Sequence, residues 1–431
     1  MHRTKRRAAL AAAALVAAVT AATLPAASAA PGAAASTERV SVGRGGTQAD
    51  GASELPDVSD DGRYVVFSTE AKNLVPGDTD TWPDVYVRDL KRGTVERVSV
   101  QDSGAEFTDF TGQRPTISGD GRYVTFAAVS YDKDGNYYSG IYLRDLKKKR
   151  TELVSLSDAD KPVTGEGTTA ARTSADGRYV AFVSQLKDNG DYVDGMNSGV
   201  YVRDRKKGTT KRISEIVTGG ASSSYYIAQF TTSADGSHIG YSIGQQRPGR
   251  DGRTYIYDVK AGEGRRLDLT PSGADREVGV ESLSRDGRYG VFAARSGDLV
   301  PGDTNEKYDI FRIDLRTDAI ERIVYDAAGG QTDGDSIEAR ITPDGRRVVF
   351  NSSASGLVAG DPGQGSLYVR DLRTGKNQRV DVPQGGGDAD SRVSHFGMDA
   401  DAKTVAFSSD ATNLVAGDTN EVRDIFVRHL R

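Results

Sequence analysis

A nine-residue pattern, Ser-x-Asp-Gly-Arg-Tyr-Val-x-Phe, recurs along this chain of 431 residues. Close copies span Ser59–Phe67, Ser118–Phe126 and Ser174–Phe182, and weaker copies span Ser233–Tyr241, Ser284–Phe292, Thr342–Phe350 and Asp399–Phe407. The aligned aspartates are Asp61, Asp120, Asp176, Asp235, Asp286, Asp344 and Asp401. They follow one another at intervals of 51 to 59 residues, and a period of this length indicates a repeat architecture.

Each copy of the repeat predicts the same four β-strands. The Asp-Gly pair marks a tight turn, because glycine adopts positive φ without steric cost. A short first strand such as Leu55–Val58 precedes the turn, and a second strand such as Tyr64–Thr69 follows it. Strands such as Val85–Leu90 and Val95–Val100 complete the unit. Seven units of four antiparallel strands predict an all-β fold, a seven-bladed β-propeller.

The two chain ends predict that the ring closes. The seventh copy stops after its third strand, at Arg431, and its fourth strand is found at the other end of the repeat region. There, Thr37–Val42 nearly repeats the sequence of Val95–Val100. We therefore expect the N-terminal strand to complete the last blade of one domain, 37–431. An open β-solenoid, the alternative, would leave end units that need caps.

The turn motif, followed by Asp-Val-Tyr-Val-Arg-Asp-Leu at Asp84–Leu90, resembles the TolB-like propeller repeat of bacterial exported proteins, a distant relative of the Trp-Asp (WD40-like) repeats. The resemblance covers residues 37–431. It implies a propeller used for protein docking in the periplasm, or the propeller part of some peptidases and sugar-processing enzymes. The chain departs from the peptidase members, because we expect no second domain that could hold a hydrolase site.

The first 29 residues have the pattern of a cleaved signal peptide. Arg3, Lys5, Arg6 and Arg7 precede an Ala/Leu/Val run at 8–24, and Ala27-Ser28-Ala29 fits a cleavage site. A membrane anchor is the alternative, but the run is short and Ala-dominated. Residues 30–36 resemble a flexible leader. We expect a secreted or periplasmic protein with no later membrane span.

The net charge limits the kinds of partner, and the cysteine content limits how the fold is stabilised. The whole chain has a net charge of −5, and loss of four basic residues with the signal leaves −9. An acidic surface argues against nucleic acid as a partner. The chain has no cysteine, so its stability must come from packing alone. We expect a monomer that binds a protein or an extracellular or cell-wall glycan.

Three loops between second and third strands share an acidic pattern that could hold calcium through hard oxygen ligands. The candidate ligands are Asp78, Asp80 and Asp84, then Asp303, Asn305 and Asp309, then Asp418, Asn420 and Asp424. The loops lack the glycine and the closing Glu of an EF-hand. Asp and Asn in tight loops also bond their own backbone, and we favour that interpretation. No cofactor is expected.

Catalytic signals are weak, and no catalytic residue is predicted. The sequence lacks a thiol, a Gly-x-Ser-x-Gly motif and a His-Glu-x-x-His motif. Of the four histidines, only His395, at the start of a first strand, could face a central pocket. Lone histidines of this kind are more often structural.

Tyrosines outside the repeat positions are candidate ligand anchors. Tyr131, Tyr137, Tyr138 and Tyr192 are predicted to lie in variable loops of blades 2 and 3, and Tyr225 and Tyr226 in blade 4. Exposed tyrosine rings bind proteins and sugar rings well. The leading hypothesis is a non-enzymatic binding propeller that uses loops of one face. A glycan lyase or hydrolase with an axial site and a structural surface protein are the alternatives.

Overall fold

The computed structural model describes residues 35–79, 82–107, 111–131, 137–158, 160–162, 170–184, 199–214, 225–245, 253–269, 276–360, 363 and 365–431. All of them belong to one compact unit, Ala35–Arg431. The predicted signal peptide lies outside the described residues, so it stays a prediction.

Seven four-stranded antiparallel sheets make up the described chain. Blade 1 consists of β2(Ser53–Val58), β3(Tyr64–Thr69), β4(Asp84–Asp89) and β5(Thr94–Arg97), and blade 2 of β6(Thr111–Ile117), β7(Tyr123–Tyr131), β8(Tyr137–Asp145) and β9(Arg150–Leu153). Blade 3 consists of β10(Ala170–Thr173), β11(Tyr179–Ser184), β12(Gly199–Asp204) and β13(Thr209–Arg212), and blade 4 of β14(Tyr225–Thr232), β15(His238–Gln245), β16(Arg253–Asp258) and β17(Glu263–Arg266). Blade 5 consists of β18(Ser282–Leu283), β19(Tyr289–Ala294), β20(Asp309–Asp314) and β21(Ala319–Arg322), and blade 6 of β22(Ser336–Ile341), β23(Arg347–Ser352), β24(Ser366–Asp371) and β25(Lys376–Arg379). Blade 7 consists of β26(Val393–Met398), β27(Thr404–Ser409), β28(Asp424–His429) and β1(Ser36–Arg39). A 3-10 turn, η1(Arg44–Gly46), follows β1.

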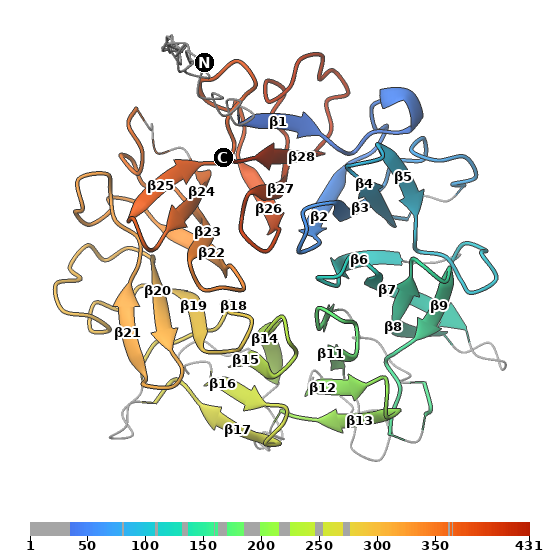
Figure 1. Ribbon diagram of the computed structural model, residues 1–431, viewed down its shortest axis with the longest axis horizontal. Coiled ribbons are helices and arrows are strands. Elements are labelled where there is room, and N and C mark those ends of the chain that lie inside the picture. The colour runs from blue at the N-terminus through green and yellow to red at the C-terminus, as the bar shows by residue number, and fades with distance from the viewer. Residues whose placement is uncertain are drawn as a thin grey trace, which may run out of the picture. The chain divides into compact units, whose positions relative to one another are not determined.

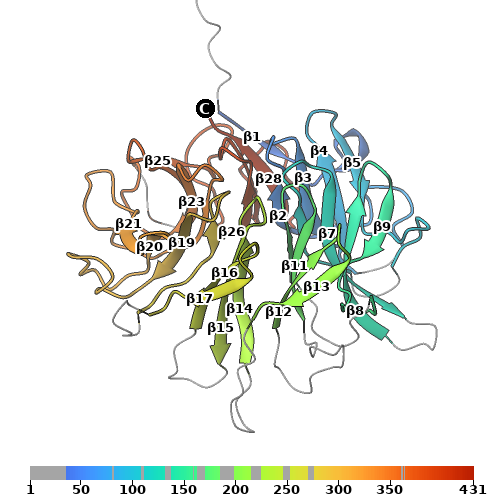
Figure 2. The ribbon, with the colours of Figure 1, turned by 60° about the horizontal axis from the view of Figure 1, so that its bottom comes forward.

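The sheets are arranged as the blades of a ring, with the first strand of each blade innermost (Figure 1). Figure 2 shows the same blades from a tilted direction, standing around the common axis. The seven-bladed β-propeller predicted from the repeat is therefore confirmed.

Strand β1 completes the seventh blade, as the sequence predicts. It pairs antiparallel with β28, and Thr37 lies opposite Arg428. The paired strand is Ser36–Arg39, and the N–H of Val40 donates one further bond to the Ile425 carbonyl at 2.8 Å. The ring is closed by hydrogen bonds between the two ends of the repeat region (Figure 1).

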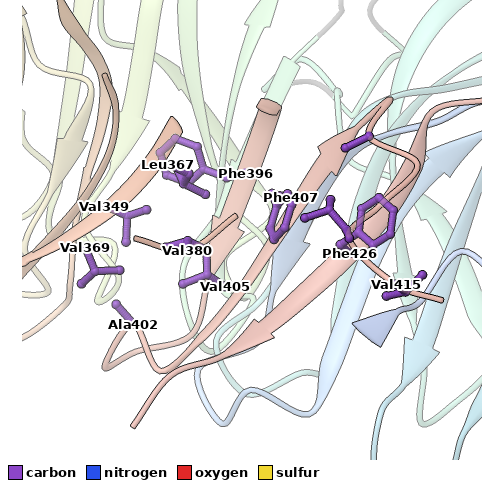
Figure 3. Close-up of a cluster of buried hydrophobic side chains, with 12 residues drawn as sticks. Val349, Leu367, Val369, Val380, Phe396, Ala402, Val405, Phe407, Val415 and Phe426 are labelled. Atoms are coloured by element: carbon purple, nitrogen blue, oxygen red, sulfur yellow. The ribbon is translucent and has the colours of Figure 1, made fainter. Parts of the chain in front are cut away.

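An aromatic pair lies in the core of every blade. The Phe of the repeat, or Tyr241 in blade 4, faces an aromatic residue of the third strand, with ring centroids 5.1 to 6.2 Å apart. Figure 3 shows the pair of blade 7, Phe407 and Phe426, among buried Val and Leu side chains of blades 6 and 7. The blades thus pack face to face, which explains why their second strands are apolar on consecutive residues.

The Tyr and the Gly of the repeat meet across neighbouring blades. Tyr64 lies against Gly121 of the next blade, where an added Cβ would come within 2.7 Å of the ring. Tyr123 lies in the same way against Gly177. Both glycines also have positive φ. Glycine is therefore required in this turn for two reasons: its positive φ and the close approach of an aromatic ring from the neighbouring blade.

Candidate functional site

A cavity of about 720 Å³ lies on the propeller axis and is lined by all seven blades. It is built mainly from the innermost strands, at matching positions: Leu55, Arg114, Ala170, Gln229, Glu338 and His395. Strand β2 begins opposite the end of β3, with Ser53 paired to Thr69. The wide end therefore opens on the face that carries the loops between second and third strands.

The backbone is irregular where it lines this cavity. Leu55, Arg114 and Glu338 all have positive φ, between 50° and 57°, although none is glycine. At the same place the register of the first strand shifts against the second in blades 1, 2, 6 and 7. Non-glycine residues at positive φ cost of order 1 kcal/mol each, and such strain is often found at functional sites.

Three arginines line the cavity, and they differ in their partners. Arg340 Nη1 lies 3.5 Å from Asp57 Oδ1, and its guanidinium packs over the Phe396 ring. Arg172 packs over Phe230 and donates a long bond of 3.4 Å to the Ala171 carbonyl. Within the described chain, neither Arg172 nor Arg114 has a carboxylate partner.

The Arg172 guanidinium is the most perturbed of these groups. Burial lowers its pKa to about 10, and the positive charges of Arg340 and Arg114 act in the same direction, while Asp57 opposes them. The side chain keeps some exposure, because it borders the cavity. The Arg172 guanidinium still keeps its proton at neutral pH, so the cavity wall carries a positive charge there that the protein compensates poorly.

The carboxylates of the cavity wall are all engaged elsewhere. Asp57 accepts a bond of 3.1 Å from the Ile117 N–H in addition to Arg340. Glu281 accepts bonds from the backbone N–H groups of Ala293 and Ala339, at 3.1 and 2.5 Å. Glu338 accepts a bond from the amide of Asn351 at 2.7 Å. Asp57 and Glu281 thus link different blades, and Glu338 is bonded within its own blade.

His395 lines the cavity, where the sequence allowed it to lie. Its backbone N–H bonds to Ser408 Oγ at 3.1 Å, and its ring Nδ1 is buried without a partner among the described residues. Burial lowers the pKa of His395, although Glu54 and Glu338 oppose the shift. The ring is therefore neutral at pH 7.

The opposite end of the axis narrows to a space of about 170 Å³. It is lined by the variable second residue of six repeats, namely Asp60, Gly119, Ala175, Ala234, Pro343 and Ala400. The corresponding residue of the remaining repeat is Arg285. Backbone bonds link these residues from blade to blade, for example Asp60 N–H to the Gly119 carbonyl at 2.9 Å. Pro343 lacks a backbone N–H, so it cannot donate the corresponding hydrogen bond to the turn of blade 7.

Two of these turn residues carry charge, and they meet across the axis. Arg285 Nη2 of blade 5 lies 2.8 Å from Asp60 Oδ2 of blade 1, with three blades between them on one side of the ring and two on the other. This pair lies over the narrow end. The axial space is therefore a cavity that is open on the loop face and restricted on the turn face.

The repeated Ser, Asp and Arg of the motif form the turn itself. In blade 1, Asp61 Oδ1 accepts bonds from Ser59 Oγ and the Arg63 N–H, at 2.6 and 3.1 Å. Arg63 in turn forms a two-pronged pair with Asp89, the last residue of β4, at 3.1 and 2.7 Å. The same contacts recur in blades 2, 3 and 5. These contacts support the interpretation of the motif as turn chemistry.

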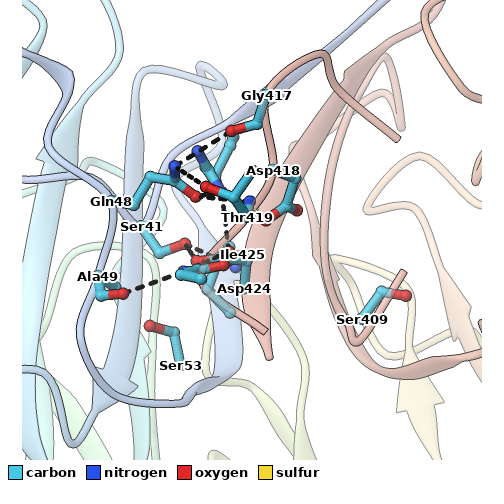
Figure 4. Close-up of polar contacts among 12 residues, drawn as sticks. Ser41, Gln48, Ala49, Ser53, Ser409, Gly417, Asp418, Thr419, Asp424 and Ile425 are labelled. Carbon is cyan, nitrogen blue, oxygen red and sulfur yellow. Dashed lines mark hydrogen bonds and ion pairs between the residues drawn. The ribbon is translucent and has the colours of Figure 1, made fainter. Parts of the chain in front are cut away.

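In the calcium-candidate loops, arginines from the fourth strand lie among the acids. Arg39 Nη1 is 2.8 Å from Asp418 and 3.1 Å from Asp424, and Arg322 Nη1 is 3.5 Å from Asp303 and 3.6 Å from Asp309. Figure 4 shows Asp418 and Asp424 among the polar contacts of blade 7.

Blade 1 has the tightest acid group of the described chain, Asp78, Asp84 and Glu106. Arg97 Nη1 contacts Glu106 and lies 3.2 Å from Asp84 and 3.6 Å from Asp78. Asp80 falls outside the described residues.

Asparagine amides also point toward the acids, since Asn305 and Asn420 each donate at 3.0 Å to Asp309 and Asp424. Donors surround the carboxylates, which favours a hydrogen-bonded scaffold over a shell of oxygen ligands. The prediction that these acids fix turns and do not bind calcium stays to be tested.

The predicted tyrosine anchors are only partly described. Tyr131 and Tyr137 belong to strands, where they pair with each other at the end of an extended β7–β8 hairpin, and Tyr138 pairs with Ser130. The prediction that they lie in a loop is wrong, because the β-forming tyrosines prolong the ladder. Tyr225 and Tyr226 likewise begin β14. Tyr192 lies outside the described residues.

Sequence reasoning missed Arg114, Arg172 and Arg340, and also the Asp60–Arg285 pair. These residues lie at positions where the residue type varies from blade to blade. Two features of the sequence could have indicated them: a charged residue inside a predicted innermost strand, and a charged residue at the variable second position of the turn, where most blades carry small residues.

No family model and no curated protein sequence matches the chain. Solved structures similar to it are β-propellers. The β-propeller domain of the Trilobed protease from Pyrococcus furiosus, described as having an open velcro topology, is 14% identical with a TM-score of 0.54, and the match covers 88% of this chain and 93% of that one. The oligogalacturonate lyase from Vibrio parahaemolyticus is also 14% identical with a TM-score of 0.54, over 93% and 98% of the two chains. At this identity the likeness concerns the fold alone. No helix among the described residues is long and apolar enough to cross a membrane.

Proposed function

We propose that this chain is an exported, non-enzymatic propeller of the TolB-like kind that binds a saccharide in its axial cavity. The observation that carries the proposal is the cavity itself, which is open on one face and restricted by Asp60 and Arg285 on the other. Its volume of about 720 Å³ lies within the range of roughly 300–1,000 Å³ that is typical of small-molecule sites. Export rests on the signal-peptide pattern of residues 1–29.

The lining supports binding better than catalysis. Asp57, Glu281 and Glu338 already accept hydrogen bonds from the protein, so the wall does not offer a free acid and base at matched distance. Arg114, Gln229 and His395 face the cavity with polar groups that suit the hydroxyls of a sugar.

A glycan-processing enzyme is the second candidate, and one observation favours it. His395 lies in the cavity with an unpartnered Nδ1 and a lowered pKa, so it could accept a proton at neutral pH. A glycan turned over by the purified protein, with loss of turnover in His395→Gln, would decide for this function.

The experiment for the binding proposal is a glycan array probed with the mature protein, followed by calorimetry on the hits. Two variants distinguish binding in the cavity from binding by the tyrosines. One is Gln229→Ala in the cavity, and the other replaces Tyr137, Tyr138 and Tyr192 together with Ala. We expect the cavity variant to weaken binding and the triple variant to leave it nearly unchanged. Loss of binding in the triple variant alone would place the site on the loops. Capture of a protein partner without any saccharide hit would replace the proposal by protein docking.

A further inference from the structure

The cavity carries positive charge in a protein that is otherwise acidic. The chain as a whole has a net charge of −5. Arg114 and Arg172 project from neighbouring innermost strands, β6 and β10, into the same cavity. Arg340 is compensated by Asp57, whereas Arg172 and Arg114 have no carboxylate partner in the described part of the chain.

The protein contains many acids and nevertheless leaves these two guanidiniums without one. The nearby Glu281 carboxylate accepts two backbone N–H groups, and Glu338 turns to Asn351. Elsewhere in the fold, buried or half-buried arginines pair with aspartates, as Arg39 does with Asp418 and Asp424, or donate shorter bonds to uncharged oxygens, as Arg370 does to Asn377 Oδ1 at 2.9 Å and Arg428 does to Thr37 Oγ1 at 2.8 Å. Arg172 has only the long bond of 3.4 Å to the Ala171 carbonyl within the described chain. Arg172 is half-buried, whereas Arg114 is exposed to the solvent at the cavity. A half-buried charge without a close partner is costly, so the position of Arg172 in the cavity indicates that a ligand supplies the counter-charge.

We infer that the axial cavity recognises a carboxylate-bearing sugar, a uronate, through Arg172 and Arg114. The inference rests on the proposed saccharide binding and adds the chemical class of the ligand. The planar guanidinium matches a carboxylate with two parallel N–H bonds, which a neutral sugar cannot accept in the same way.

The Arg172 guanidinium carbon lies 6.0 Å from the centroid of the Phe230 ring, at the outer limit of a cation–π contact. The neutral His395 ring is a polar partner that adds no charge to the cavity wall.

The test compares trigalacturonate with the same trisaccharide carrying methyl-esterified carboxylates, by calorimetry on the full mature chain. The ester keeps the sugar rings and removes the charge. We expect the acid to bind at least about tenfold more tightly than the ester, with an affinity that falls as salt rises. Arg172→Gln and Arg114→Gln should each remove most of this preference, while Arg172→Lys should keep part of it.

Arg150→Gln is the matched control. Arg150 begins β9, the outermost strand of the same blade as Arg114, and its side chain is exposed. This variant should retain the preference for the acid. Equal affinity for acid and ester would overturn the uronate inference and leave saccharide binding intact. Failure of both trisaccharides to bind would overturn the saccharide proposal together with the inference.

Discussion

Arg285 and Asp60 form an ion pair across the propeller axis, with 2.8 Å between Arg285 Nη2 and Asp60 Oδ2. The two side chains are 46% and 32% exposed, so water screens the pair. We expect a coupling energy of about 0.2–1 kcal/mol from urea denaturation of the native protein, Asp60→Asn, Arg285→Gln and the double variant. Exchange of the two charges, as Asp60→Arg with Arg285→Asp, should restore the coupling. An absent coupling would show that the pair does not form in solution.

Removal of the closing strand should destabilise the whole ring. A chain that begins after Val42 exposes the edge of β28 and leaves the buried Ile425 and Val427 uncovered. We expect aggregation or a large fall in Tm, measured by calorimetry and light scattering against a chain that begins at Ala35. The milder variant Val40→Ala, at a fully buried site, should cost roughly 1–3 kcal/mol. A truncated chain that melts like the control would contradict the closure.

Gly121→Ala tests the contact between blades 1 and 2. The new methyl group meets the Tyr64 ring at 2.7 Å, and the backbone has a φ of +69°. The positive φ costs about 1–2 kcal/mol and the overpacking about 1–3 kcal/mol, so a total loss of roughly 2–5 kcal/mol is expected by urea denaturation. Gly93→Ala is the control, because its φ is +66° while the nearest neighbouring atom is 4.0 Å away. Equal losses in both variants would show that the ring contact contributes nothing.

The recurrent Arg–Asp pairs predict sensitivity to acid. The Arg178 hydrogen bond holds the pKa of Asp204 below its usual value, and the Arg63 hydrogen bond does the same for Asp89. Because the folded-state pKa lies below the unfolded one, the ionised carboxylate stabilises the fold above about pH 4 and loses this effect as the pH falls through the folded-state pKa. The Tm of Arg178→Gln should lie below that of the native protein at pH 7, and the difference should shrink below about pH 4. A pH-independent difference would rule out this linkage.

Calcium should leave the protein unchanged. In blades 1, 5 and 7 an arginine already lies beside the acids that would hold the ion, as Arg322 does beside Asp303 and Asp309. Titration of calcium into chelator-treated protein should give no heat and no shift in Tm, whereas Asp303→Ala should cost about 0.5–3 kcal/mol with or without calcium. Heat of binding that disappears in Asp303→Ala or Asp418→Ala would establish a metal site.

The sequence predicted the fold well because every blade repeats the residues that build it. Ser59, Asp61 and Arg63 form the turn of blade 1, and their counterparts form the turns of the other blades, so one local rule applied seven times gives the ring. Closure was also predictable, since the segment at Thr37 copies the one at Val95.

The cavity was harder to predict, because the residue type at its lining positions varies from blade to blade. Arg114 aligns with Leu55 in blade 1 and with Ala170 in blade 3, and only the closed ring brings these residues to one place. Of the predicted site residues, His395 alone is described at the cavity. The predicted loop was wrong at Tyr131 and Tyr137, because a regular hairpin continues there, while the role of these tyrosines as ligand anchors stays a prediction.

The pairing of β1 with β28 has a consequence for how the chain folds. Thr37 and Arg428, which bond through Thr37 Oγ1 at 2.8 Å, are separated by 391 positions. Joining the ends of so long a flexible segment costs about 5 kcal/mol of chain entropy, and only a chain whose intervening blades have already formed is spared most of it. The first strand to be synthesised must therefore wait for the last, and a chain that is still being made or exported cannot complete its seventh blade. Ring closure therefore requires the chain to extend through β28, since a chain that stops short of this strand leaves β1 without its partner.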